Sequence, residues 1–212
     1  MLFQTTQAHE QLRAKIRAFA EEEVKPIAFS LDQANEFPAE AVKKLGELGL
    51  MGIPYPKEYG GAGLDAISYA IAVEELARIG VQRMLRIGSC GALTDRLNLG
   101  DLVLVQAAVR DDGTSAGYAP LSYPAIADLE VLTACQRAAT ALNASHMVGL
   151  ARSHDCLYGD NNPSLYEEWS RRGVIASDME TASLFVVGRL RGVQCGSILN
   201  VVAGFHKDVA ES

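Results

Sequence analysis

Two short polar stretches of the sequence carry residue types that can hold a small ligand. The first is RIGSCG, residues 86–91, in which glycines stand between an arginine and a serine. Arg86 offers a planar fork of donors that suits a phosphate, and Ser89 adds a hydroxyl donor. A glycine turn at Gly88 lets backbone N–H groups converge on an anion. These residues predict a phosphate site at the end of a strand, and a plain strand-to-loop turn with a surface arginine remains the alternative.

The second stretch is SDMETAS, residues 177–183, which opens a predicted helix. Ser177 or Asp178 can cap that helix, and an acidic first turn suits the helix dipole. The carboxylate of Glu180 can accept hydrogen bonds from two vicinal hydroxyls, as on a ribose. Met179 offers a soft apolar surface to a sugar ring. A sugar site and an ordinary helix start both fit these residues.

Composition limits the classes of protein and partner. The chain has 212 residues, of which 49% are hydrophobic, so it can bury a sizeable core. Its net charge of −7 disfavours nucleic acid and anionic membrane surfaces as partners. We expect neither a signal peptide nor a membrane span, because no apolar run approaches about 20 residues. The four cysteines lack any zinc-site spacing, so we expect no metal, free thiols and a cytoplasmic location.

Hydrophobic periodicity changes its character along the chain. Three helices are predicted first, at about 7–25, 38–49 and 67–79, with a kink or end near Pro26 and a stop at Gly49. Short apolar runs then alternate with helical patterns. Strands are predicted at 84–88, 101–109, 146–152 and 193–202, and helices at 125–142, 164–172 and 179–192. This order predicts an α/β fold with a mostly parallel sheet and flanking helices, in which ligands bind beyond the carboxyl ends of the strands.

From about residue 67 onward the sequence resembles the nucleoside phosphorylase family, which contains uridine phosphorylases and hexameric purine nucleoside phosphorylases. The stretches that carry the resemblance are RIGSCGAL, LGDLVLVQAAVRDDGTSAGYAPLSYPAIAD, SHDCLY, YEEW and SDMETASLF. The resemblance implies that inorganic phosphate, as co-substrate, attacks C1′ of a nucleoside and releases the base and ribose 1-phosphate. It implies no metal or organic cofactor, small-molecule partners only, and a homo-oligomer.

The same resemblance implies roles for individual residues. Arg86, Gly88 and Ser89 would bind phosphate, and Met179 with Glu180 would bind ribose. Leu157 and Tyr158 would lie in the base region. No catalytic acid or base is assigned.

Departures from the family leave the base open. Leu157 stands where the family usually has a phenylalanine, and the short stretch GDNNPSLYEEW lacks the glutamine and arginine that bind uracil in the uridine enzymes. Asn200 stands in the stretch where the purine enzymes carry an aspartate. The first strands of the family, with a Gly-Asp-Pro loop for phosphate, are not found before residue 67.

The front of the chain, at about residues 5–80, resembles the start of acyl-CoA dehydrogenases. The stretches that carry this resemblance are IRAFAEEEVKPIA, FPAEAVKKLGELGLMGIPYPKEYGGAGLD and ISYAIAVEELARIG. The sequence therefore predicts a chimera, with an all-α segment at 1–66 and a truncated phosphorylase-like α/β domain at 67–212. A nucleoside phosphorylase with impaired activity, an acyl-CoA-dehydrogenase-related flavoprotein fragment and a non-catalytic interaction fragment remain the three alternatives, so enzymatic activity stays undecided.

Overall fold

The computed structural model describes residues 5–34, 36–156, 159 and 162–205. The chain folds into two compact units, Met1–Gln82 and Arg83–Ser212. Residues 67–82 thus pack with the first unit, and the boundary at residue 66 stays a prediction about family resemblance. No helix in the described part of the chain has the length and apolar character needed to cross a membrane.

The first unit is all-helical in its described residues. Its elements are α1 (Gln7–Phe19), a π-helical turn (Ala20–Val24), α2 (Lys25–Ala34), α3 (Ala39–Glu47), a 3₁₀ turn (Lys57–Tyr59) and α4 (Ala66–Arg78). Its core joins Ile16 of α1, Ile53 of the loop and Ile71 of α4, each at most 2% exposed. The predicted helix at 67–79 is confirmed, and so is the stop at Gly49, whose φ of +77° is a conformation that glycine adopts readily.

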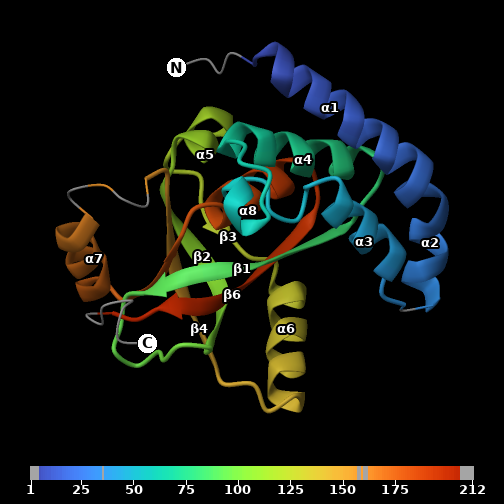
Figure 1. Cartoon of the computed structure of the whole chain (residues 1–212). Helices are drawn as coiled ribbons and strands as arrows, with labels where there is room; N and C mark the ends of the chain where they lie inside the picture. Colours follow the sequence, from blue (N-terminus) through green and yellow to red (C-terminus); the bar gives the residue numbers. More distant parts are fainter. Residues whose placement is uncertain (1–4, 35, 157–158, 160–161, 206–212) are drawn as a thin grey trace. The chain divides into compact units, whose positions relative to one another are not determined.

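Near Pro26, where a kink or end of the helix is predicted, the helix contains a π-helical turn and then continues as α2. Figure 1 shows α2 continuing from α1 without a loop but in a changed direction, with the π-helical turn between them. Proline has no N–H to donate, and a wider turn just before it relieves the crowding of its ring against the preceding turn. Pro26 itself then lies in the first turn of α2.

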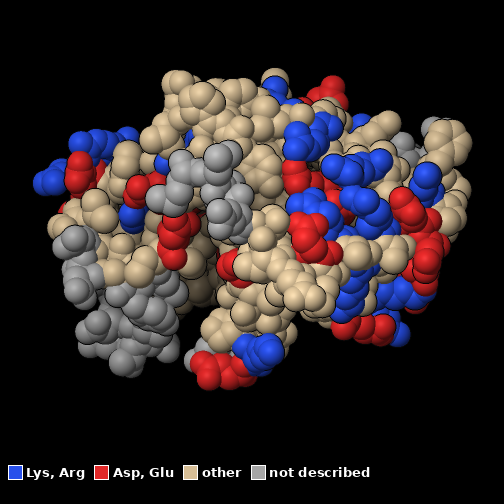
Figure 2. Space-filling model, turned by 90° about the horizontal axis from the view of Figure 1, so that it is seen from above, with Lys and Arg blue, Asp and Glu red and all other residues tan. Residues whose placement is uncertain are grey.

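An ion-pair network joins α1 to α4. Arg13 Nη1 donates to Glu75 Oε1 at 3.0 Å, and Arg17 Nε donates to Glu75 Oε2 at 2.7 Å. Burial acts to raise the pKa of Glu75, but the hydrogen bonds from Arg17 and Arg13 outweigh it and hold the pKa below its usual range. On the surface of these helices, Figure 2 shows positive and negative side chains interleaved.

Replacing Glu75 by alanine is expected to lower the free energy of unfolding by about 1–3 kcal/mol, because two charge-assisted hydrogen bonds are lost. Since the folded-state pKa is lowered, this stabilisation is present near neutral pH and disappears as the pH falls through that pKa. Urea unfolding at neutral and acidic pH measures both effects. The control is Glu21→Ala on the exposed face, and an equal loss in the two variants would contradict the role of Glu75.

The second unit combines six strands with four helices in its described residues. Its strands are β1 (Arg83–Ala92), β2 (Leu102–Asp111), β3 (Ala125–Ile126), β4 (His146–His154), β5 (Val174–Asp178) and β6 (Gln194–Ala203). Its helices are α5 (Gly113–Tyr118), α6 (Leu129–Ala141), α7 (Asn162–Arg171) and α8 (Thr181–Leu190). The helix predicted from residue 125 begins only at Leu129, because the Asp128 side chain caps it by accepting from the N–H groups of Glu130 and Val131.

The α/β class is confirmed, but the strands form a closed barrel of mixed direction in place of the predicted mostly parallel sheet. The strand order is β3-β2-β4-β5-β1-β6, and β2 also pairs with β6, so five strands close into a barrel. The long ladders β1–β6 and β2–β4 are parallel, whereas β1–β5 and the closing β2–β6 pair are antiparallel. Closure pairs the backbone groups that an open sheet would leave unpaired at its edges. Hydrophobicity patterns alone do not reveal that the sheet closes.

Helix α8 is the most deeply buried helix of this unit in its described residues. Thr181 to Gly188 are all buried, and Phe185, Val186 and Val187 are at most 1% exposed. The helix contacts β1, β2, β3, β4 and β6. Because it is packed on so many strands, its first turn is held in a fixed place beside the barrel.

Candidate functional site

The residues of the two polar stretches meet although they are far apart in sequence. Arg86 of β1 donates from Nη2 to Oε2 of Glu180, 94 residues further along the chain. The same Nη2 lies 3.7 Å from Oδ2 of Asp178 at the end of β5. Arg86, Glu180 and Asp178 are 9%, 5% and 4% exposed, so one guanidinium faces two carboxylates away from water. Attraction between such charges is much stronger there than at a surface.

Asp178 fixes the start of α8 as well. Its Oδ2 accepts hydrogen bonds from the backbone N–H and the hydroxyl of Thr181, and its Oδ1 accepts from Ser153 Oγ at 2.6 Å. The Ser153 hydroxyl in turn accepts from the N–H of Ala182 at 2.9 Å. Of the two caps that the sequence allows, Asp178 therefore serves α8, while Ser177 points elsewhere. Glu180, at the N-cap position, keeps its carboxylate for Arg86.

The predicted glycine turn at residues 86–91 is wrong. Strand β1 continues to Ala92 and pairs with β6 through this stretch, with a register shift between Cys90 and Gly91. Gly88 has a different use: a Cβ atom added to it would collide with the Arg86 guanidinium. The missing side chain therefore leaves the space in which the guanidinium lies.

The remaining predicted residues are placed in part. Ser89, half-buried, pairs with Asn200 in the β1–β6 ladder. Met179, also half-buried, stands between Asp178 and Glu180. Leu157 and Tyr158 lie outside the described residues, and the ligand roles of all these residues stay predictions.

Burial changes the protonation of two groups in the cluster. It raises the pKa of Glu180 above the ordinary glutamate value, an effect that Arg86 opposes and Asp178 reinforces. It also raises the pKa of the Cys90 thiol to about 12. Cys90 therefore stays a neutral thiol near neutral pH, which does not favour it as a nucleophile.

A second buried arginine, Arg152 of β4, was missed by sequence reasoning. Its Nε and Nη2 donate to Oδ2 of Asp111, at 2.8 and 2.5 Å, and its Cζ lies 5.9 Å from the centre of the Tyr166 ring. Arg152 is 3% exposed, and its Nη1 makes no hydrogen bond to any described residue. Nearby, His154 Nε2 and Ser177 Oγ are 2.8 Å apart. A charged residue ending an apolar strand was the available signal, but its partner Asp111 becomes visible only through the pairing of β2 with β4.

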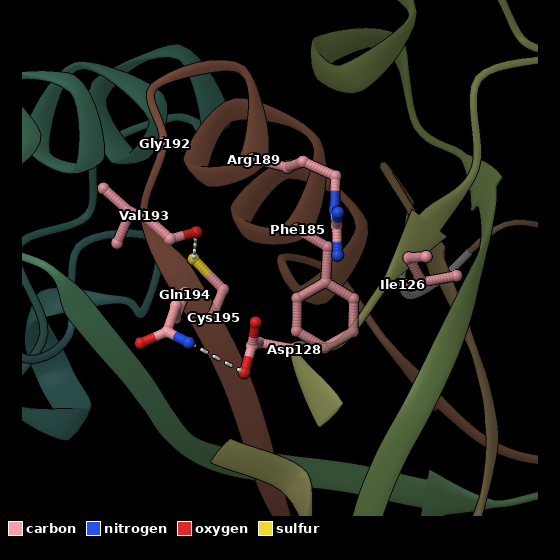
Figure 3. A pocket seen from close by; sticks show the side chains of 8 residues that line it. All are labelled: Ile126, Asp128, Phe185, Arg189, Gly192, Val193, Gln194 and Cys195. Atoms are coloured by element: carbon pink, nitrogen blue, oxygen red, sulfur yellow. Dashed lines mark hydrogen bonds between the residues drawn. The ribbon is translucent and has the colours of Figure 1, made fainter. Parts of the chain in front are cut away.

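A hollow of about 190 Å³ lies elsewhere in this unit, at the amino end of β6. Figure 3 shows the Arg189 side chain above the Phe185 ring and the Asp128 carboxylate to the left of the ring. Asp128 is already engaged, since it caps α6 and accepts a hydrogen bond from Gln194. We therefore assign no ligand to the hollow. Among the described residues, no group of three or more His, Cys, Asp or Glu side chains is arranged to hold a metal ion.

Comparison with known proteins gives two resemblances along one chain. Residues 6–95 match the family model of the acyl-CoA dehydrogenase N-terminal domain. The short-chain-specific acyl-CoA dehydrogenase of Clostridium acetobutylicum is 56% identical over 79 residues, which are 37% of this chain and 21% of that protein.

The remainder is similar to nucleoside phosphorylases. The uridine phosphorylase of Escherichia coli (strain K12) is 37% identical over 153 residues, and the guanosine phosphorylase of Halorubrum lacusprofundi is 37% identical over 149. These alignments cover 66% and 68% of this chain, which spans only 60% and 61% of the two relatives.

A crystal structure of uridine phosphorylase from Vibrio fischeri ES114 superposes with a TM-score of 0.65 at 41% identity, covering 66% of this chain and 59% of that one. The predicted combination of an acyl-CoA-dehydrogenase-like front with a phosphorylase-like remainder is thus confirmed.

Gly88→Ala is expected to push the Arg86 guanidinium out of its place, because the new methyl group occupies the same space. If Arg86 binds phosphate, the rise in melting temperature caused by added phosphate should disappear in this variant. Thermal unfolding with and without phosphate measures this. Gly91→Ala is a matched control, since its added Cβ meets nothing within 4 Å. An unchanged phosphate effect in Gly88→Ala would contradict the placement of the anion at Arg86.

Proposed function

We propose that the chain binds a nucleoside and inorganic phosphate and cleaves the nucleoside to the free base and ribose 1-phosphate. The observation that carries the proposal is the contact between Arg86 and Glu180. It brings a guanidinium that would bind phosphate next to a carboxylate that would accept hydrogen bonds from ribose hydroxyls. The similarity to uridine and guanosine phosphorylases supports the same function. Because the chain spans about three fifths of those relatives, reduced activity is part of the proposal.

In the proposed reaction a phosphate oxygen forms a bond to C1′ while the bond from C1′ to the base nitrogen breaks. The electron pair of the broken bond leaves with the base, which gains the proton that the attacking hydrogen phosphate loses, and positive charge develops on the ribose in the transition state. A phosphate held by Arg86 would attack C1′ and would also stabilise the positive charge on the ribose. Glu180 would accept ribose hydroxyls and so orient C1′. This chemistry requires phosphate as co-substrate and no metal or organic cofactor.

We also propose a homo-oligomer in the cytoplasm. Ile87 of β1 and Val202 of β6 are 72% and 52% exposed, and apolar strand residues left open in this way favour association with another copy. All four cysteines are free, which suits a reducing compartment. The acyl-CoA-dehydrogenase-like part spans 21% of its relative, and we attach no activity to it.

The direct test is phosphorolysis by the purified chain. Uridine, inosine and thymidine are incubated with and without phosphate, and the free base is quantified. We expect slow base release that requires phosphate and is lost in Arg86→Ala. Absence of release, together with no thermal stabilisation by phosphate, would refute the proposal. A visible flavin absorbance in the purified protein would instead favour the dehydrogenase-related alternative.

Glu180→Gln should weaken nucleoside binding by about 10-fold or more, because an amide cannot accept two hydroxyl hydrogen bonds as strongly as a carboxylate. Stabilisation by phosphate should remain, since Arg86 is still present. Calorimetric titration with a nucleoside and thermal unfolding with phosphate separate the two effects. Equal nucleoside affinity in Glu180→Gln and the unmodified chain would refute the ribose role.

Nucleoside affinity should also depend on pH. The pKa of Glu180 is raised, so the protonated form, a poorer acceptor, persists above the ordinary value of about 4.3. Affinity should therefore rise with pH through the raised pKa and then level off. Titrations at a series of pH values measure this, and Glu180→Gln should show a flat profile. A matching rise in that variant would assign the effect to another group.

A further inference from the structure

We infer that Asp112 is a positioning residue, which acts through Ser183 to hold the first turn of α8 where Glu180 would meet the ribose. This inference rests on the proposed function and concerns a residue outside the RIGSCG and SDMETAS stretches. Asp112 follows β2 directly and is 4% exposed. It would act through the helix and not by contact with a substrate.

The first turn of α8 is attached to the ends of three different strands. Each of the three residues that follow Glu180 donates a hydrogen bond to a buried side chain at or just beyond the carboxyl end of a strand. The donor–acceptor pairs are Thr181–Asp178 on β5, Ala182–Ser153 on β4 and Ser183–Asp112 beyond β2. Because Glu180 is the N-cap residue of α8, these attachments set the position of its backbone.

The three strands are successive in the barrel, in the order β2-β4-β5. Both neighbouring pairs run parallel, so their carboxyl ends meet at one rim. Two attachment points leave a helix turn free to rotate about the line that joins them. Because the rim of a barrel is curved, a third point lies off that line and removes the rotation. The attachment to Asp112 therefore adds a constraint that β4 and β5 do not supply.

Asp112 is itself fixed from the side of α5. Its Oδ2 accepts from the N–H of Ser115 and its Oδ1 from the Ser115 hydroxyl, both at 2.6 Å. Arg110 Nε donates to the same hydroxyl at 3.0 Å. The other nitrogens of Arg110 donate to backbone carbonyls within residues 115–123. The carboxylate is thus held in place independently of α8, as an anchor must be.

A role as the cap of α5 alone leaves the contact with α8 unexplained. Capping uses the Ser115 N–H, and α5 has only six residues. The bond from Ser183 Oγ to Asp112 Oδ2, at 2.9 Å, joins residues 71 positions apart. Ser183 is 2% exposed, so water does not compete for this bond. Hydrogen bonds to a charged group are among the strong ones, and this one is spent on the helix that begins after Glu180.

Loss of this attachment should weaken nucleoside binding and leave phosphate binding in place. Glu180 can accept ribose hydroxyls only while its carboxylate is correctly oriented. If the first turn of α8 spends part of its time in other arrangements, the apparent affinity falls with the fraction that is correctly placed. Arg86 lies on β1, which makes no contact with Asp112 in the described hydrogen bonds, so the phosphate group keeps its place.

The test compares Ser183→Ala with the unmodified chain. Calorimetry without phosphate gives the dissociation constants of uridine and inosine, and thermal unfolding with and without phosphate reports on phosphate binding. We expect the nucleoside dissociation constants to rise about 5-fold or more, because a charge-assisted hydrogen bond is lost, while phosphate still raises the melting temperature. Hydrogen exchange at the N–H groups of Thr181 and Ala182 should become faster, since the turn is held less firmly.

Ser115→Ala is the matched control. It is the same change at an equally buried residue, and it removes the hydroxyl bonded to the other oxygen of Asp112. It should lower the melting temperature but leave nucleoside affinity and exchange in α8 unchanged. A merely structural role of the two serines would give both variants the same nucleoside affinity.

Asp112→Asn is the conservative variant. The Ser115 N–H still requires an acceptor, so the amide oxygen takes the place of Oδ2 and keeps the contact with Ser183. The amide nitrogen can then donate to the Ser115 hydroxyl, which has two lone pairs. Asp112→Asn should therefore retain most of the nucleoside affinity that Ser183→Ala loses.

Unchanged nucleoside affinity in Ser183→Ala would overturn the inference, and so would an equal loss in Ser115→Ala or Asp112→Asn. Unchanged exchange at Thr181 and Ala182 would overturn it as well, whether or not a nucleoside binds. Failure of the proposed function is recognised separately, in the unmodified chain, by the absence of both phosphate stabilisation and phosphate-dependent base release.

Discussion

A buried guanidinium must be neutralised where it lies, and the second unit is organised around that requirement at Arg86. The neutralising groups, Asp178 and Glu180, come from the end of β5 and the start of α8. Asp178 also caps α8, so one carboxylate links the position of a charge to the position of a helix. Gly88 leaves the room that the guanidinium occupies. Moving any of these residues would disturb the others, because interiors are packed without spare space.

The same requirement is met differently at Arg152. There the neutralising carboxylate, Asp111, is partly exposed, and one edge of the guanidinium remains open. The first arginine thus lies between two buried acids, whereas the second is neutralised by one acid that is partly exposed.

The helices and strands whose formation depends on residues close in the sequence could be predicted from local patterns. The positions of α4, β2 and β4 were close to those observed, because their hydrophobic periodicity and flanking glycines are local signals. Barrel closure could not be predicted, since the β2–β6 pairing depends on strands distant in sequence. The supposed turn at Gly88 is continuous strand for a similar reason: glycine can mark a turn or a close approach, and only Arg86 folding over it shows which applies.

The candidate site shows the same difference: its residue types could be predicted from the sequence, but contacts between distant residues could not. Arg86 and Glu180 could be singled out by residue type and family resemblance, but their direct contact could not. The carboxylate of Asp178 was predicted only as a possible cap, because its second contact, with Arg86, comes from another strand. Arg152 escaped notice altogether, since an arginine at the end of an apolar strand usually reaches water.

Closure of the barrel has a consequence for the order in which the chain assembles. The β1–β6 ladder pairs Arg83 with Gln194 and the β2–β6 ladder pairs Leu102 with Asn200, so both ladders join the start of the second unit to its end. Contacts between distant residues form slowly, because a long loop must first be closed. The helices of the first unit depend on shorter-range contacts. We therefore expect the chain to acquire its helical front early, and the arginine cluster, whose members lie on β1, β5 and α8, only as the barrel completes.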